Sequence, residues 1–206
     1  MKYLSRFFLV GLLYACLLCS ASAAESPPFA RFLTASAHYF HSSDLLFGTF
    51  VEGTAYSLNA KAIHSRTGLG AGVSYVYSRR KSDYASFGAI VAHELSGILV
   101  YRLARFRKPF SIDPYIGVGA GVFYMQETTI PTVILRYGGE DFVSDSDRTL
   151  VGTTLELGIP MRITKHVGII LQINNEFALL SEQETNFDES FQIGGLGYGI
   201  GICYYF

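Results

Sequence analysis

The sequence contains no tryptophan and only three cysteines, and its charged residues are few and nearly balanced in sign. Cys16 and Cys19 lie within the first 24 residues, so a mature chain without that segment would keep only Cys203, which excludes an internal disulfide framework. With 16 basic and 17 acidic residues, the chain is a poor candidate for nucleic-acid binding. No apolar run beyond residue 24 approaches the roughly 20 residues that a membrane-spanning helix needs.

The first 24 residues have the three parts of a secretory signal peptide. Lys2 and Arg6 form a basic start, residues 7–19 form an apolar centre, and residues 20–24 are small. We therefore predict that residues 1–24 are a signal peptide and that the protein is exported.

The cleavage site is expected near Ala23 or Ala24, because Ala21 and Ala23 fit the A-x-A rule. A lipoprotein cleavage box at 13–16 (Leu-Tyr-Ala-Cys) is the alternative, although the small-residue site is better formed. After cleavage, residues 25–206 would keep 14 basic and 17 acidic residues, a formal net charge of −3. That length is enough for one domain.

Beyond residue 24 the dominant pattern is an alternation of apolar residues with glycine or polar residues. In segment 196–206, for example, every even position is a large apolar residue or tyrosine, and most odd positions are glycine. Strict alternation is typical of strands with two unlike faces. The pattern predicts eight strands, at about 31–41, 47–62, 68–80, 85–104, 112–126, 149–163, 167–181 and 192–206.

The predicted connections alternate in length and in charge. If both termini lie at one end, the short and mainly basic turns 63–67, 105–111 and 164–166 lie at that end too. The other connections, 42–46, 81–84, 127–148 and 182–191, then lie at the opposite end, and the last two are acidic. Outer-membrane barrels have short periplasmic turns and longer external loops.

The charged residues of the strands fall mainly on the face opposite the apolar one. A soluble barrel or sandwich would have a polar outer face, so the apolar face is predicted to meet lipid. The expected fold class is all-β: a transmembrane, eight-stranded, antiparallel up-and-down β-barrel.

Two segments resemble the small outer-membrane barrels of the OmpA, OmpX and OmpW kind: PYIGVGAGV (114–122), after a basic turn, and the terminal GYGIGICYYF (197–206). The resemblance covers residues 25–206. It implies a bacterial outer membrane, external loops, periplasmic termini, contact with outer-membrane lipid, and recognition of Phe206 by the barrel-assembly machinery. The missing tryptophan girdle is a departure, and tyrosines would have to serve at the interfaces instead: Tyr75, Tyr77, Tyr101, Tyr124 and Tyr204.

The alternation places six charged side chains, three of each sign, inside the predicted barrel. An eight-stranded barrel has just enough room for side chains, and an unpaired charge there would be costly. The balance predicts a mutually paired interior network that fills the middle and the periplasmic half. Its members are Lys61, Glu94, Arg102, Glu156, Arg162 and Glu176.

Near the predicted external ends of the strands, the inward positions are mostly apolar. Such a lumen suits a pocket for a small hydrophobic molecule, and it resembles the OmpW branch, whose members are implicated in the passage of small apolar compounds. Ordinary packing of a closed barrel mouth is the open alternative. The pocket candidates are Phe40, Val51, Ile90, Phe123, Met125, Leu150, Leu180 and Ile193.

No catalytic residue, cofactor or metal site is predicted. The glycine runs 117–121 and 195–201 keep strand spacing and open no helix, unlike a nucleotide-binding fingerprint. They either make room for bulky side chains opposite or keep a lumen open.

The histidines offer no clear site either. His38, His41 and Asp44 could cluster at the first loop, but two histidines three residues apart on an extended segment face opposite ways. The pair His41 and Ser43 only superficially resembles the His-x-Ser pair of lipid A deacylase barrels. His93 falls on the lipid-facing side, and the pattern does not explain it.

Two functions remain. The leading hypothesis is an OmpW-like barrel that binds or passes small hydrophobic molecules. The alternative is an OmpX- or OmpA-like plugged barrel that acts as a structural or adhesion protein through its external loops, since loops on rigid scaffolds often bind partners. A general porin is not expected, because aqueous channels need about 16 strands.

Overall fold

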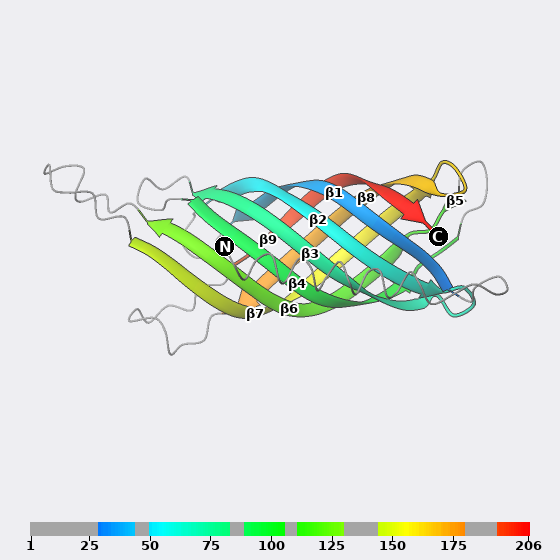
Figure 1. Cartoon of the computed structure of the whole chain (residues 1–206), viewed down its shortest axis with the longest axis horizontal. Helices are drawn as coiled ribbons and strands as arrows, with labels where there is room; N and C mark the ends of the chain where they lie inside the picture. Colours follow the sequence, from blue (N-terminus) through cyan, green and yellow to red (C-terminus); the bar gives the residue numbers. More distant parts are fainter. Residues whose placement is uncertain (1–28, 44–49, 83–88, 106–110, 130–143, 180–192) are drawn as a thin grey trace, which may run out of the picture.

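The computed structural model describes residues 29–43, 50–82, 89–105, 111–129, 144–179 and 193–206, and these form one closed antiparallel β-barrel (Figure 1). Among these residues, no helix is long and apolar enough to cross a membrane. The eight long strands are β1 (Phe29–Ser43), β2 (Phe50–His64), β3 (Leu69–Ser82), β4 (Ala89–Arg102), β6 (Tyr115–Thr129), β7 (Ser144–Arg162), β8 (Val167–Leu179) and β9 (Ile193–Tyr205).

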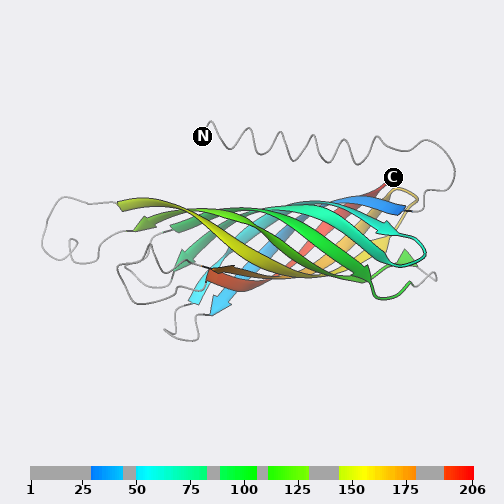
Figure 2. The same cartoon turned by 90° about the horizontal axis from the view of Figure 1, so that it is seen from below.

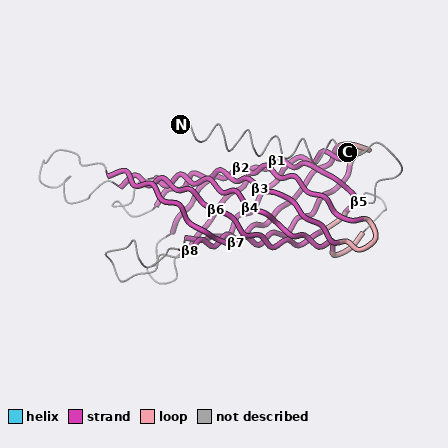
Figure 3. Tube along the Cα trace, turned by 60° about the horizontal axis from the view of Figure 1, so that its bottom comes forward, coloured by secondary structure: helices cyan, strands magenta, loops and turns pink. Residues whose placement is uncertain are grey.

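Each long strand pairs with its neighbours in the sequence, and β9 also pairs with β1 to close the barrel. The strands run obliquely around the barrel (Figure 2). The start of β1 lies beside the C-terminal Phe206, whose N–H donates to the carbonyl of Arg31 at 3.2 Å. The turns 65–68 and 163–166 lie at this end too, and Figure 3 shows turns in pink at the end where the C-terminus lies. We call this end the turn end, and the opposite end, where β1 finishes at Ser43, the loop end.

The turn between β2 and β3 shows how the short connections are closed. Gly68 has a φ of 74°, in the left-handed region that favours glycine. Its backbone N–H donates to the carbonyl of His64 at 3.0 Å, and its carbonyl accepts from the N–H of Arg102 at 2.8 Å. The turn is thus tied both to its own hairpin and to the next strand.

The eight predicted strands are confirmed, but some of their predicted ends are wrong. Strands β6 and β7 stay paired as far as Thr129 and Ser144, so the predicted loop 127–148 is too long. Asp145 and Asp147, which we expected in that loop, lie on β7. Backbone pairing can continue where apolar alternation has stopped, because the ladder hydrogen bonds do not require an apolar face.

The predicted turn 105–111 is also wrong at its end. Ser111 and Ile112 form a two-residue strand, β5, which pairs with Arg162 and Met161 at the end of β7. A strand of two residues is too short to produce an alternation that the sequence could reveal.

The two faces of the barrel have the polarity that the alternation predicts. Outward side chains such as Leu99 and Val151 are each 67% exposed, whereas the inward Lys61 and Glu156 are each only 3% exposed. Charged side chains thus lie inside the barrel and aliphatic side chains lie on its outer surface. This distribution of polarity is the reverse of that in a soluble protein.

The glycines on the inner face make room for side chains of the neighbouring strands. A Cβ on Gly197 would lie 3.1 Å from the ring of Phe40, and a Cβ on Gly199 would lie 2.5 Å from Nδ1 of His38. A Cβ on Gly119 would lie 2.9 Å from the side chain of Ile98. The glycine runs therefore make room for bulky side chains, which is the first of the two roles predicted for them, and they do not keep the lumen open.

An apolar cluster fills the interior toward the turn end. Its members come from six strands and are all buried: Phe32, Ile63, Ile98, Val100, Tyr115, Ile170, Cys203 and Tyr205. The sequence predicted only charged filling there, so the turn-end half of the interior is more apolar than expected.

Candidate functional site

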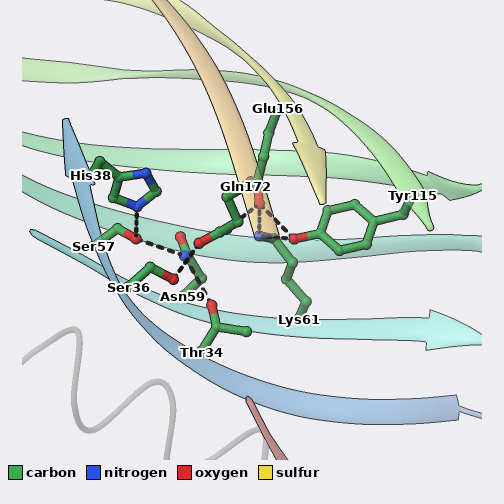
Figure 4. Close-up of polar contacts among 9 residues, drawn as sticks. All are labelled: Thr34, Ser36, His38, Ser57, Asn59, Lys61, Tyr115, Glu156 and Gln172. Atoms are coloured by element: carbon green, nitrogen blue, oxygen red, sulfur yellow. Dashed lines mark hydrogen bonds and ion pairs between the residues drawn. The ribbon is translucent and has the colours of Figure 1, made fainter. Parts of the chain in front are cut away.

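An ion pair crosses the barrel interior. Lys61 on β2 and Glu156 on β7 come from opposite walls, since three strands separate β2 from β7 in either direction around the barrel. Nζ of Lys61 lies 2.5 Å from Oε1 of Glu156, and the two side chains are almost completely buried. The pair therefore bridges the lumen between β2 and β7 (Figure 4).

Two neutral side chains complete the hydrogen bonding of this pair. The hydroxyl of Tyr115 donates to Oε1 of Glu156 at 2.5 Å and accepts from Nζ of Lys61 at 2.9 Å. Nε2 of Gln172 donates to the same carboxylate oxygen at 2.7 Å. Because hydrogen bonds satisfy both charges, the lumen can hold them without the full penalty of burial.

A second group of polar side chains continues from Gln172 toward the loop end. Oγ of Ser36 donates to Oε1 of Gln172. Beside it, Nδ2 of Asn59 donates to Thr34 at 3.0 Å and to Ser57 at 3.3 Å, and Oγ of Ser57 bonds Nε2 of His38 at 2.8 Å. Figure 4 shows these side chains close together in the interior, and they come from β1, β2 and β8.

The other four predicted network charges have partners of several kinds. Oγ1 of Thr154 donates to Glu94 at 2.5 Å. Arg102 donates to the backbone carbonyls of the β2–β3 turn, at 3.2 Å to His64 and 2.7 Å to Ser65. The guanidinium of Arg162 lies 4.0 Å from the ring centroid of Tyr205. Glu176 is buried on β8.

The structure thus brings Lys61 and Glu156 together as a pair and ties the two arginines to the turn end. Sequence reasoning missed the neutral members, above all Tyr115 and Gln172. Gln172 stood at an inward position of the alternation and could have been found there. Tyr115 could not, because a tyrosine at the end of a strand is also typical of a membrane interface.

The structure describes the side chains of three of the eight pocket candidates. Phe40, Phe123 and Leu150 are buried inside the barrel in its loop-end half. The side chains of Val51, Ile90, Met125 and Ile193 are outside the described set, and Leu180 lies outside the described residues altogether. The hydrophobic pocket therefore stays a prediction.

The histidines of β1 face opposite ways, as predicted. His38 is buried in the interior, whereas Nδ1 of His41 lies 3.7 Å from a carboxylate oxygen of Glu52 on the outer side. Asp44 lies outside the described residues. Within the part of the chain that the structure describes, no group of three or more His, Cys, Asp and Glu residues is placed to hold a metal ion.

The packing of Tyr115 gives a first testable prediction. A Cβ on Gly158 would collide with the ring and hydroxyl of Tyr115, whereas a Cβ on Gly97, on the outer face, would meet nothing within 4 Å. We expect Gly158→Ala to destabilise the barrel by about 1–3 kcal/mol through overpacking. Gly97→Ala should leave stability nearly unchanged. Urea unfolding followed by tyrosine fluorescence measures both, and equal losses in the two variants would contradict the packing described.

No protein-family model matches the sequence, and no curated protein matches it. Solved structures do match. Neisserial surface protein A superposes with a TM-score of 0.58 at 18% identity, over 87% of this chain and 98% of that one. A major outer membrane protein from Thermus thermophilus superposes with a TM-score of 0.57 at 11% identity, over 86% of this chain and 99% of that one. The chain therefore has the fold of the small eight-stranded outer-membrane β-barrels.

Proposed function

We propose that the mature protein is an integral barrel of the bacterial outer membrane, with a closed lumen, that acts as a structural or interaction protein through the loops at its loop end. The single observation that carries the proposal is the reversed polarity of the barrel. Aliphatic side chains cover the outside and charged side chains are enclosed. An apolar outer surface of this extent is compatible with a lipid environment and would promote aggregation in water.

The belts of tyrosine support the membrane placement. Tyr198 and Tyr204 face outward on β9, and between them lie the exposed aliphatic residues Ile200 and Ile202. Tyr101 lies near the turn end of β4, and Tyr124 lies toward the loop end of β6. An apolar band flanked by two aromatic belts is the surface pattern of transmembrane barrels.

The filling of the interior argues for a plugged barrel instead of a channel. The Lys61–Glu156 pair crosses the lumen, and the apolar cluster packs below it at the turn end. Eight strands enclose only enough space for such side chains. This filling favours the plugged alternative over the OmpW-like hypothesis that we preferred from the sequence.

We also propose how the protein is exported and how it is oriented in the membrane. Residues 1–24 act as a cleaved signal peptide, the turn end faces the periplasm, and the loops at the other end face the exterior. Phe206, whose ring lies 5.0 Å from that of Tyr204, is the residue that the barrel-assembly machinery would meet. Partners are membrane lipid and surface molecules, without a cofactor or covalent chemistry.

Conductance across planar bilayers tests the closed lumen. We expect the refolded mature protein, with its folding verified by heat-dependent migration in gels, to insert and remain electrically silent. Discrete conductance steps from the folded protein would contradict a plugged barrel. Failure to enter the bilayer at all would contradict the membrane placement itself.

A hydrophobic pocket at the loop end is a second candidate function, because Phe40, Phe123 and Leu150 point into the barrel there. This arrangement would bind a small apolar molecule from outside without opening a channel. Phe123→Lys is expected to abolish binding of a fluorescent apolar amphiphile while the barrel still folds. Retention of binding in the folded variant would show that the pocket is not the binding site.

A further inference from the structure

The outward-facing His93 belongs to an aromatic row. Tyr56, Tyr77, His93 and Tyr124 are register partners on the four consecutive strands β2, β3, β4 and β6. The ring centroid of His93 lies 5.2 Å from that of Tyr77 and 6.4 Å from that of Tyr124. The hydroxyl of Tyr75 bonds Nδ1 of His93 at 2.9 Å. This histidine is therefore built into a defined surface site on the outer wall.

The next outward row toward the loop end is polar except at Val91. It contains Thr54, Arg79, Val91 and Gln126, again as register partners on the same four strands. Arg79 is exposed and stands diagonally from His93 on the adjacent strand, a relation that puts the two Cα atoms roughly 7–8 Å apart. Nε2 of Gln126 donates to the hydroxyl of Tyr124 at 3.4 Å. An aromatic row is thus directly followed by a row with a cation and hydrogen-bond donors.

Arg79 differs from Arg105 at the turn end, which lies 3.3 Å from the carboxylate of Asp113. None of the described acidic side chains makes an ion pair with Arg79. On β3, Arg79 is followed in the sequence by Arg80 and Lys81. The exposed Arg79 places a cation on the outer wall, where it would attract an anion.

We propose that these two rows bind the phosphate headgroup of an anionic lipid in the leaflet at the loop end. The inference rests on the proposed membrane placement, because it requires this wall to face lipid. The Arg79 guanidinium binds two phosphate oxygens side by side, a geometry for which arginine is well suited. When the Tyr75 hydroxyl donates to Nδ1 of His93, the proton of the neutral imidazole is on Nε2, which donates to the phosphate. The rings of Tyr77 and Tyr124 pack against the lipid below its headgroup.

Lipid retention measured by native mass spectrometry tests the proposal. The barrel is placed in phosphatidylcholine nanodiscs that contain either phosphatidic acid or diacylglycerol, which has the same chains without the phosphate. We expect the wild-type protein to retain phosphatidic acid in preference to diacylglycerol. Arg79→Gln should weaken this retention roughly tenfold, the size of one lost charge-assisted hydrogen-bond pair. His93→Leu should weaken it by a smaller factor.

Arg66→Gln is the matched control, because Arg66 is an exposed arginine in the turn at the opposite end. It should retain phosphatidic acid as the wild-type protein does. Unchanged retention in Arg79→Gln, equal retention of diacylglycerol, or an equal loss in Arg66→Gln would each overturn the proposal. Complete competition by inorganic phosphate would overturn the assignment to a lipid.

The failure of this proposal can be distinguished from failure of the proposed function. A protein that enters nanodiscs but shows no preference for phosphatidic acid refutes the lipid site and leaves the membrane placement intact. A folded protein that does not enter nanodiscs refutes the membrane placement and the lipid site together.

Discussion

Replacement of Lys61 with methionine is expected to destabilise the barrel by about 3–5 kcal/mol, because it leaves the buried Glu156 carboxylate without its counter-charge. The side chain of methionine has nearly the same length, so the loss reports the charge and not a cavity. Tyr115 and Gln172 would still donate to Glu156. These two bonds satisfy lone pairs of the carboxylate but do not neutralise it.

The double variant Lys61→Met with Glu156→Met shows whether the loss comes from the unpaired Glu156 charge, because it removes both charges together. Since apolar replacement of a whole buried ion pair is often neutral or stabilising, we expect it to recover most of the lost stability. Urea unfolding of the protein folded in lipid vesicles measures both variants. A loss of less than about 0.5 kcal/mol in the single variant, the range of an ordinary surface substitution, would show that the pair is not enclosed as described.

Replacement of Ile200 with arginine is expected to cost about 2–4 kcal/mol in a lipid bilayer, the cost of a cation on the lipid face near the middle of the membrane. Ile200 faces outward between the tyrosines at 198 and 204 and is 58% exposed. In a water-soluble barrel the same substitution would remove an exposed aliphatic residue and cost almost nothing.

Ile163 provides the matched control for this prediction. It is almost equally exposed, at 59%, but it lies at the turn end just after β7. Ile163→Arg is expected to cost about 0–1 kcal/mol, because an arginine at the interface reaches water. Equal losses for the two arginine variants would indicate that both positions lie in the same solvent and would contradict the membrane placement.

The alternation in the sequence could predict the number of strands and the direction of their side chains. A strand whose two faces meet different surroundings must alternate apolar with small or polar residues. The alternation could not predict where the strands end. The residues of 144–148 alternate no apolar set, yet they extend β7 by pairing with β6. Their pairing depends on the geometry of the hairpin and not on the polarity of the side chains.

The interior site was predictable in part. The inward charges were visible from their positions, and Lys61 and Glu156 do meet across the lumen. Which charges meet depends on the tilt and stagger of the strands, which fix the position of each residue around and along the barrel. For the same reason the sequence showed His93 as an isolated exception, whereas the register places it among Tyr75, Tyr77 and Tyr124.

The measurement that tests the central claim most directly is the solvent accessibility of nitroxide labels at positions 200 and 202 in lipid vesicles, introduced into a Cys203→Ser background. A label at position 163 serves as the reference for water. We predict that labels at 200 and 202 collide readily with lipid-soluble oxygen and are shielded from a water-soluble nickel complex, while the label at 163 shows the reverse. Free access of the nickel complex to positions 200 and 202 in the folded protein would contradict an apolar outer face embedded in lipid.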